Sequence, residues 1–326
     1  MTVLVTAGTG KTSQRLVPYL DKAEVSYILT SRSAKASSAS SPRYVQFDFT
    51  NPSTFVNAFP SDVKDKINAV WLIAPIEEVN AAEITIEFIN YAVKEHSVKR
   101  FVMLTGTSAT KGGPSVGQVW QRLAELEVEF TVLRATWFTG KVPHQSLRLA
   151  YQKHNWSGVV ENFTEWYHHK TIKEESNIYS AAEDGRARYV TADDIARTAF
   201  HALTVSICPS FLLLFSWFNQ KQDTVPLPEN VQVLGPELLS LDQVAQIFTE
   251  VLGRPVKHIR LAEDERVKFF QEKSGLIAST AAFMTWLEVR TASGGEEHTS
   301  DTVEKYTGIK PKGLREWVEE HKKVFE

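Results

Sequence analysis

Cysteine is almost absent from this chain of 326 residues, and charge of neither sign dominates it. The single cysteine, Cys208, excludes an internal disulfide and a cysteine-based metal cluster. Lys and Arg number 36 against 39 Asp and Glu, with both signs interspersed, so no electrostatic footprint for nucleic acid is visible. The longest apolar run, residues 211–218, is far shorter than the roughly 20 residues that span a bilayer. We therefore expect a cytoplasmic protein that binds neither membrane nor nucleic acid.

Two further patterns are missing. The N-terminus has neither the basic segment nor the long apolar segment of a secretory signal. The adjacent histidines His168 and His169 lack the i, i+4 spacing of a helical zinc site, so we predict no metal. Hydrophobic residues make up 43% of the chain, which is enough for one large domain or two moderate ones.

Short β-rich runs alternate with helical patterns through the first half of the chain. Such alternation, with strands rich in Val, Ile and Leu, predicts a Rossmann-type, doubly wound parallel α/β sheet covered on both faces. A sheet of this kind binds ligands outside the carboxyl ends of its strands. We expect strands at 2–6, 25–30, 44–49, 68–74, 100–105 and 129–134, and helices near 12–22, 52–59, 77–95 and 115–127.

The pattern weakens after residue 140 and predicts a smaller, mixed region in which a substrate pocket is completed. Tyr189-Val190 indicates a short strand that leads into a helix ending near Leu203. The stretch Ser240–Gln243 is a capping box, which predicts a helix that runs to Leu252. A last helix is expected at residues 314–324.

The stretch VLVTAGTGKTSQRLV near the N-terminus resembles two nucleotide-binding motifs. A P-loop needs a glycine five positions before the one that precedes the lysine, and Val5 stands there instead. The G-x-G-x-x-G template is met at Gly8 and Gly10, with Ser13 in place of the third glycine. Gly8 suits the tight turn, Gly10 lets the backbone approach a pyrophosphate, and the following helix points its N–H groups at the anion. A glycine turn in an ordinary β–α unit is the alternative.

The end of the second strand favours NADP(H) over NAD. An NAD site places an acidic residue about 20 positions after the glycines, whereas here Arg32 stands between Ser31 and Ser33. A guanidinium and two hydroxyls suit a 2′-phosphate; a solvated arginine is the alternative. Asp48, which ends the third strand, can accept from an adenine amino group or serve as a local turn residue. We expect the cofactor site to comprise Thr6, Gly8, Gly10, Lys11, Thr12, Arg32, Asp48, Pro75, Thr105 and Gly106.

No tyrosine lies between residues 92 and 150. Short-chain dehydrogenases that reduce ketones carry a Tyr-x-x-x-Lys there to supply a proton. Either this chain binds cofactor without turnover, or its substrate needs hydride alone, as an iminium ion does because hydride addition gives a neutral amine. The catalytic residues are therefore unknown; Lys111 is a candidate to orient the nicotinamide ribose, or a solvated loop lysine.

Sequence blocks spread over nearly the whole chain carry a family resemblance. The blocks are Gly8–Thr12, Ser31–Ser33, Ala69–Leu72 before Pro75, Lys99–Val102, Lys111–Pro114 with Gly117-Gln118, Leu133-Arg134 with Thr136–Phe138, Glu161–Phe163, Asp193–Ala196 and Leu234–Leu239. They resemble the NmrA-like branch of atypical short-chain dehydrogenases, and within it the fungal festuclavine/agroclavine dehydrogenases of ergot-alkaloid biosynthesis. The blocks KGGP and TWF are fairly specific to this group.

The resemblance implies NADPH-dependent reduction of a cyclic iminium, derived from chanoclavine-I aldehyde, to a tetracyclic clavine. It also implies an aromatic pocket for a cation, with Trp120, Trp137, Phe138 and Trp166 as substrate contacts, and a pathway enzyme that supplies the iminium. Two alternatives stay open. One is an NmrA-like regulator that senses NADP and binds a protein partner without chemistry, and the other is an NADPH quinone reductase.

Two segments depart from the family. Relatives run almost directly from the TWF block into the ENF block, whereas residues 140–160 intervene here, and relatives lack the apolar stretch 205–220. Both inserts begin with residues whose codons can form a 5′ splice signal, so we hypothesise that they are translated introns. We divide the chain into an NADP-binding domain at 1–139, the insert, and a substrate-pocket region at 161–326 that packs on the same domain.

Overall fold

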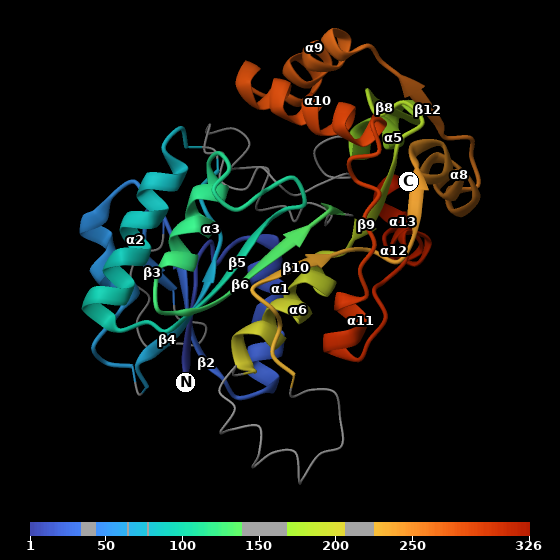
Figure 1. Ribbon diagram of the computed structural model, residues 1–326. Coiled ribbons are helices and arrows are strands. Elements are labelled where there is room, and N and C mark those ends of the chain that lie inside the picture. The colour runs from blue at the N-terminus through green and yellow to red at the C-terminus, as the bar shows by residue number, and fades with distance from the viewer. Residues whose placement is uncertain (34–43, 64, 77, 139–167, 206–224) are drawn as a thin grey trace. The chain divides into compact units, whose positions relative to one another are not determined.

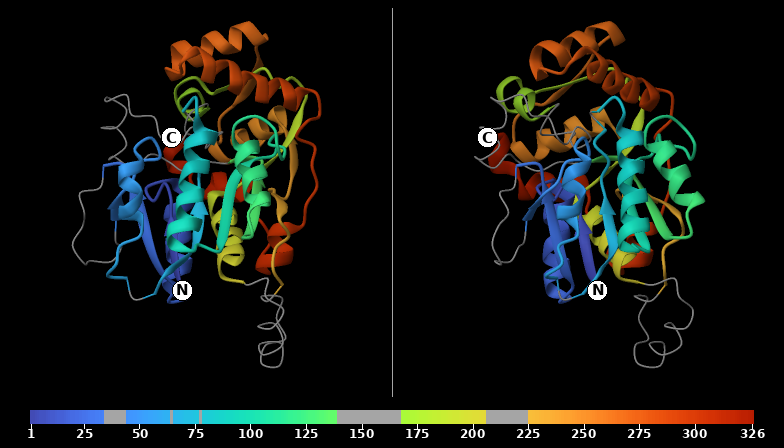
Figure 2. Two further views of the ribbon diagram at one scale, coloured as in Figure 1. Left: turned by 60° about the vertical axis from the view of Figure 1, so that its left-hand side comes forward. Right: turned by 90° about the vertical axis from the view of Figure 1, so that its left-hand side faces the viewer.

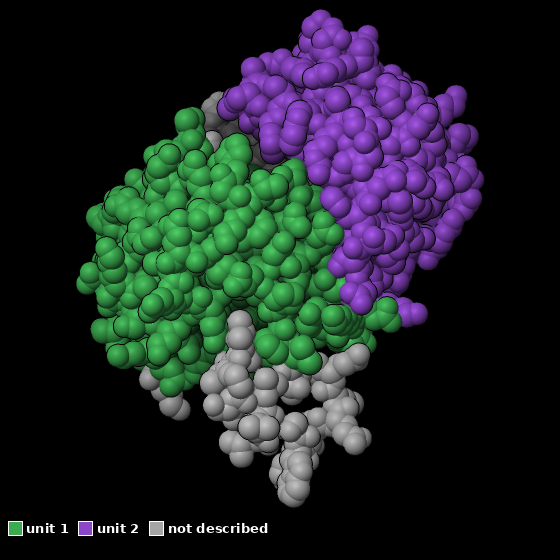
Figure 3. Space-filling model, viewed as in Figure 1, with its two compact units in different colours: residues 1–135, 195–233, 302–309 green, residues 136–194, 234–301, 310–326 purple. Residues whose placement is uncertain are grey.

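A computed structural model describes residues 1–33, 44–63, 65–76, 78–138, 168–205 and 225–326 (Figure 1). The chain forms two compact units, each assembled from three separate stretches (Figure 3). Unit 1 comprises residues 1–135, 195–233 and 302–309, and unit 2 comprises residues 136–194, 234–301 and 310–326. Within the described ranges, no helix is long and apolar enough to cross a membrane.

Unit 1 is built on a parallel sheet of seven strands (Figure 1). The strands lie in the order β10-β6-β5-β4-β1-β2-β3, and every pair is parallel. Apart from β10 this is the 3-2-1-4-5-6 order of the Rossmann fold, which confirms the predicted fold class. Its strands are β1 (Thr2–Val5), β2 (Ser26–Ser31), β3 (Tyr44–Gln46), β4 (Ile67–Leu72), β5 (Arg100–Gly106), β6 (Glu129–Ala135) and β10 (Asn230–Val233).

Helices cover both faces of this sheet because the strand order reverses at β1 and right-handed crossovers then deliver helices to opposite faces. On one face α2 (Ala81–His96) packs beside α3 (Val116–Glu125) (Figure 2). Tyr19 of α1 (Lys11–Lys22) lies 6.0 Å, between ring centroids, from Phe200 of α6 (Ala192–Thr204). Elsewhere in the described part of unit 1 lie the 3-10 helix η1 (Pro52–Ala58) and α11 (Thr302–Thr307).

Unit 2 is mixed, as predicted, and contains two small sheets. One sheet joins β11 (Leu238–Ser240), β9 (Arg186–Val190) and β7 (Trp137–Phe138), and the other joins β12 (Lys257–Arg260) and β8 (Asn177–Ser180). The helices in its described residues are α5 (His169–Glu175), α8 (Leu241–Leu252), α9 (Glu263–Ser274), α10 (Ala278–Ala292), α12 (Leu314–Glu320) and α13 (Lys322–Phe325).

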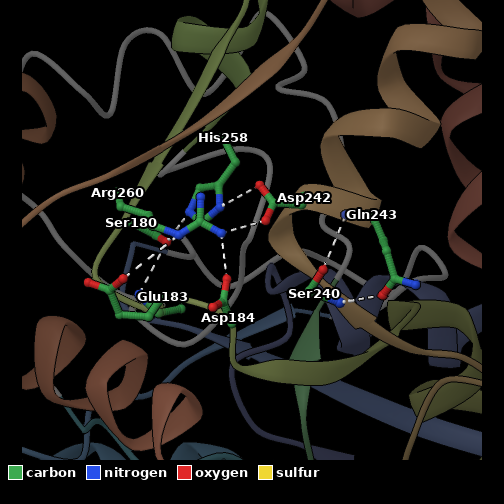
Figure 4. A network of polar contacts seen from close by, with 9 residues as sticks. Ser180, Glu183, Asp184, Ser240, Asp242, Gln243, His258 and Arg260 are labelled. Atoms are coloured by element: carbon green, nitrogen blue, oxygen red, sulfur yellow. Dashed lines mark hydrogen bonds and ion pairs between the residues drawn. The ribbon is translucent and has the colours of Figure 1, made fainter.

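The predicted capping box opens α8. Ser240 Oγ accepts from the Gln243 amide at 3.3 Å, and Gln243 Oε1 accepts from the Ser240 amide at 2.9 Å (Figure 4). Gly253 ends the helix with φ at +70°. The helix predicted at 77–95 begins at Ala81, because residues 73–76 and 78–80 are turns and irregular backbone. Both inserts, except Val205, and Trp166 lie outside the described residues.

Candidate functional site

The turn between β1 and α1 brings two glycines against neighbouring backbone. A Cβ on Gly8 would lie 2.7 Å from Leu29 Cβ and 2.8 Å from Thr30 O, closer than Cβ atoms in proteins approach other atoms. The Gly8 amide donates to Thr30 O at 2.8 Å, which locks the turn onto β2. A Cβ on Gly10 would lie 2.9 Å from Ala7 O. Both glycines of the motif are thus required by the backbone itself.

Helix α1 begins directly after this turn, and no side chain caps its N-terminus. The first amides of such a helix carry partial positive charge and point at any anion beyond the helix end. Thr12, in the first turn, is fully buried, and its hydroxyl has no hydrogen-bond partner within the described part of the chain. A buried hydroxyl usually has a partner, so this end of α1 fits an anionic ligand.

Ser13 explains why the third glycine of the template is absent. Its Oγ donates to Thr6 O at 3.2 Å and accepts from Trp71 Nε1 at 3.2 Å. Trp71 in β4 is 0% exposed, so its indole N–H needs a partner inside the protein. Thr6, which directly follows β1, also connects that strand to β4, because its Oγ1 donates to Trp71 O at 2.9 Å and accepts from the Ile73 amide at 2.8 Å.

The two residues proposed for the adenosine end lie after β2 and β3. Arg32 is half-buried in the turn after β2, and the Ser31 and Ser33 hydroxyls beside it lie 3.4 Å apart. Asp48 Oδ1 accepts from the Thr50 amide at 2.9 Å and from its hydroxyl at 2.8 Å, so Asp48 does form the local turn. Its contact with adenine stays a prediction.

Pro75 follows β4, and Thr105 and Gly106 end β5. All three are partly buried. Since parallel strands end at the same edge of a sheet, the structure brings these residues together with Gly8 and Arg32 along one edge of unit 1. The residues predicted for the cofactor therefore share one edge, and their contacts with it remain to be tested.

The loop after β5, residues 107–115, has a shape that only small residues permit. Gly112 has φ at +75°, and a Cβ on Gly113 would lie 2.6 Å from Thr110 Oγ1. Ser115 is held at φ +50° and ψ −117°, a region that is nearly exclusive to glycine and costs about 1–3 kcal/mol. The two glycines of the KGGP block are thus structural requirements of this loop.

Lys111 is exposed on the same loop. The pKa of Glu125 in α3 lies below its usual value, chiefly because Gln121 donates a hydrogen bond to it, and the charge of Lys111 adds to the effect. A role for Lys111 at the nicotinamide ribose stays a prediction.

The aromatic candidates divide between the two units. Trp120 is 7% exposed in the core of unit 1, with Arg134 Cζ 5.8 Å from its ring centroid. In unit 2, Phe138 is buried, whereas Trp137 is partly exposed and donates through Nε1 to Thr291 Oγ1 at 3.3 Å. Trp137 lines a cavity.

That cavity lies in unit 2 and measures about 20 Å³, roughly room for one water. At its wall, Glu288 pairs with Arg266 through contacts of 3.1, 2.9 and 2.7 Å and accepts from the Ala181 amide at 2.8 Å. The guanidinium of Arg266 lies 3.8 Å from the ring centroid of Phe270. The cavity is lined by Trp137, His168, Ala182, Tyr189, Leu241, Glu288 and Thr291.

Burial keeps the other titratable groups of this cavity neutral. Desolvation lowers the pKa of His168 well below its usual value and raises that of Tyr189. The ion pair between Glu288 and Arg266 was not predicted from the sequence. Arg266 in α9 and Glu288 in α10 lie 22 positions apart on two different helices, so no local sequence pattern marks them as partners.

A serine, a histidine and an aspartate also line up in unit 2 (Figure 4). Ser180 Oγ lies 2.8 Å from His258 Nε2, and His258 Nδ1 lies 3.2 Å from Asp242 Oδ1. Hydrolases use the same groups, but Ser180 is 0% exposed, and its Oγ accepts from the Ala182 amide at 3.2 Å. Arg260 extends the network to the surface by donating to Asp242 at 2.5 Å. These contacts tie β8, β12 and α8 together and expose no nucleophile.

Comparison with known proteins identifies relatives along the entire chain, although no family model matches it. Agroclavine dehydrogenase from Claviceps fusiformis is 34% identical over 100% of this chain and 99% of its own length. Festuclavine dehydrogenase from Aspergillus fumigatus is 36% identical over 99% of this chain and 98% of its own. An NADPH-dependent quinone oxidoreductase from Escherichia coli, solved with NADPH, has a TM-score of 0.70 at 18% identity, covering 98% of this chain and 99% of its own, and supports the fold.

Proposed function

Because the chain belongs to the family of agroclavine and festuclavine dehydrogenases, we propose that it uses NADPH to reduce a cyclic iminium, derived from chanoclavine-I aldehyde, to a tetracyclic clavine. The observation that carries the proposal is identity of 34% and 36% with such dehydrogenases across the full length of both chains. The chain is accordingly an oxidoreductase, and its substrate is a small alkaloid.

The residues at the edge of unit 1 fit the cofactor NADP(H). Gly8 and Gly10 leave room for a pyrophosphate at the N-terminus of α1, and the buried Thr12 hydroxyl is able to donate to a phosphate oxygen. Arg32, with the hydroxyls of Ser31 and Ser33, suits the 2′-phosphate that distinguishes NADP from NAD. When bound, the reduced nicotinamide supplies a hydride.

The proposed chemistry agrees with the missing proton donor. A carbonyl substrate develops negative charge on oxygen and needs an acid, whereas an iminium becomes a neutral amine when hydride adds to it. The protein then has to orient the substrate and keep water away from it. Trp137, whose ring is oriented by Thr291, suits the first task because indole faces attract cations.

The test is NADPH oxidation, followed at 340 nm with the iminium formed from chanoclavine-I aldehyde, together with mass detection of the clavine. We expect turnover with a preference for NADPH over NADH. Tight NADPH binding without any loss of absorbance contradicts the proposal and favours an NADP-sensing regulator. Turnover of simple quinones but not of the iminium favours a quinone reductase instead. A cytoplasmic location and a pathway enzyme that delivers the iminium stay predictions.

A further inference from the structure

One side chain of β6 holds the loop after β5. Arg134 Nη1 donates to Thr107 O at 3.2 Å and to Ala109 O at 3.4 Å. Its Nε donates to Asn230 Oδ1 in β10 at 2.8 Å. A single guanidinium therefore connects the loop to the two strands at this end of the sheet, where β5, β6 and β10 are neighbours (Figure 1).

Other contacts fix the same loop at both ends. At its start, the Thr107 amide donates to Ala135 O at 3.1 Å and so continues the pairing of β5 with β6. At its end, the Gly112 amide donates to Gly117 O at 2.9 Å, which folds the loop back onto the first turn of α3. Trp120 of α3, buried in the core, supports the guanidinium from the helix side.

The loop also stores backbone strain at Ser115, and strained residues persist only where the surroundings determine their conformation. Such residues gather at sites where a fixed geometry serves function. This loop leaves the carboxyl end of β5, on the edge where an open α/β sheet binds its ligand. Its rigid shape therefore belongs to the ligand-binding edge.

We propose that Arg134 is a positioning residue for hydride transfer. It holds the backbone of Thr107–Ala109 in the place that sets how the nicotinamide ring meets the substrate. The inference rests on the proposed function. Arginine is required because its planar fork reaches two carbonyls and an amide oxygen at once, whereas the compact ammonium group of lysine cannot span all three.

The experiment compares Arg134→Met with Arg134→Lys and with a matched control, Arg100→Met. Arg100 lies at the opposite end of the same strand pair, where it is mostly buried, donates to Leu203 O at 2.7 Å and pairs with Glu129. For Arg134→Met we expect kcat to fall about 10- to 100-fold, because small displacements of reacting groups are costly. KM for NADPH should stay within about threefold, since Arg32 and the glycine turn are untouched, and Arg134→Lys should recover part of kcat.

Hydrogen exchange of residues 107–117 provides a readout that needs no substrate. We expect NADP⁺ to slow exchange there in the wild type, and Arg134→Met to speed exchange about tenfold and abolish the NADP⁺ effect. The control should lose stability without losing kcat. Unchanged exchange in Arg134→Met, or an equal loss of kcat in the control, overturns the inference. If the wild type fails to reduce the iminium, the proposed function fails, and the exchange experiment still decides whether Arg134 fixes the loop.

Discussion

Replacing Ser13 by the glycine that the dinucleotide motif normally carries there should destabilise the folded protein. Ser13 makes two buried hydrogen bonds, one to Thr6 O and one from Trp71 Nε1. In Ser13→Gly the indole N–H stays buried and loses its acceptor, which costs about 1–3 kcal/mol, and the lost bond to Thr6 adds about 0.5–1.5 kcal/mol. We expect the free energy of unfolding to fall by about 2–4 kcal/mol.

Urea unfolding followed by circular dichroism measures this loss, and a double-mutant cycle assigns it. The side chain of phenylalanine has no N–H group. Ser13→Ala should therefore lower the free energy of unfolding by about 1–2 kcal/mol less in the Trp71→Phe background than in the wild type. NADPH affinity should change little, because Gly8 and Gly10 are left in place. A Ser13→Gly protein as stable as the wild type, or a cycle without coupling, would refute this account of the motif.

Four shorter predictions test other parts of the chain. Arg32→Ala should lower the preference for NADPH over NADH about 10- to 100-fold, measured as the ratio of kcat/KM values, because it removes a charge-assisted contact; an unchanged ratio contradicts the cofactor assignment. Glu288→Gln should cost about 3–5 kcal/mol by leaving Arg266 uncompensated, and Arg266→Met should restore part of it in thermal melts. Burial raises the pKa of Tyr189, so the folded state favours the neutral phenol. The resulting contribution to the free energy of unfolding is fully present below about pH 10 and is lost as the pH rises above that value. Tyr189→Phe should therefore reduce the loss of stability at high pH in pH-dependent melts. Transcript reads that skip residues 140–160 and 205–220 support the intron hypothesis, and uninterrupted reads reject it.

The features that the sequence predicts well are those set by neighbouring residues. The six predicted strands of the first half all form, with β1 to β6 ending within three residues of the expected positions. The capping box at Ser240 forms as expected, because its four residues contain both hydrogen-bonding partners. Periodicity and local capping are enough to determine such elements.

The features that the sequence misses depend on distant partners. Strand β10 has only four residues, and its place beside β6 is set by pairing across the sheet rather than by its own pattern. Ser13 accepts a hydrogen bond from Trp71, which lies 58 positions later in the sequence, so its role cannot be predicted from the motif alone. The same holds for Arg134, whose partners come from three different elements.

The late arrival of β10 has a consequence for biosynthesis. Strand β6 is complete at Ala135, but its neighbour β10 is finished only at Val233, about 100 residues later. At translation rates of about 5–20 residues per second, the edge of β6 that pairs with β10 has no partner strand for roughly 5 to 20 s during synthesis. An unpaired strand edge of this kind attracts other chains. Ribosome-associated chaperones that shield extended segments should therefore raise the yield of folded protein.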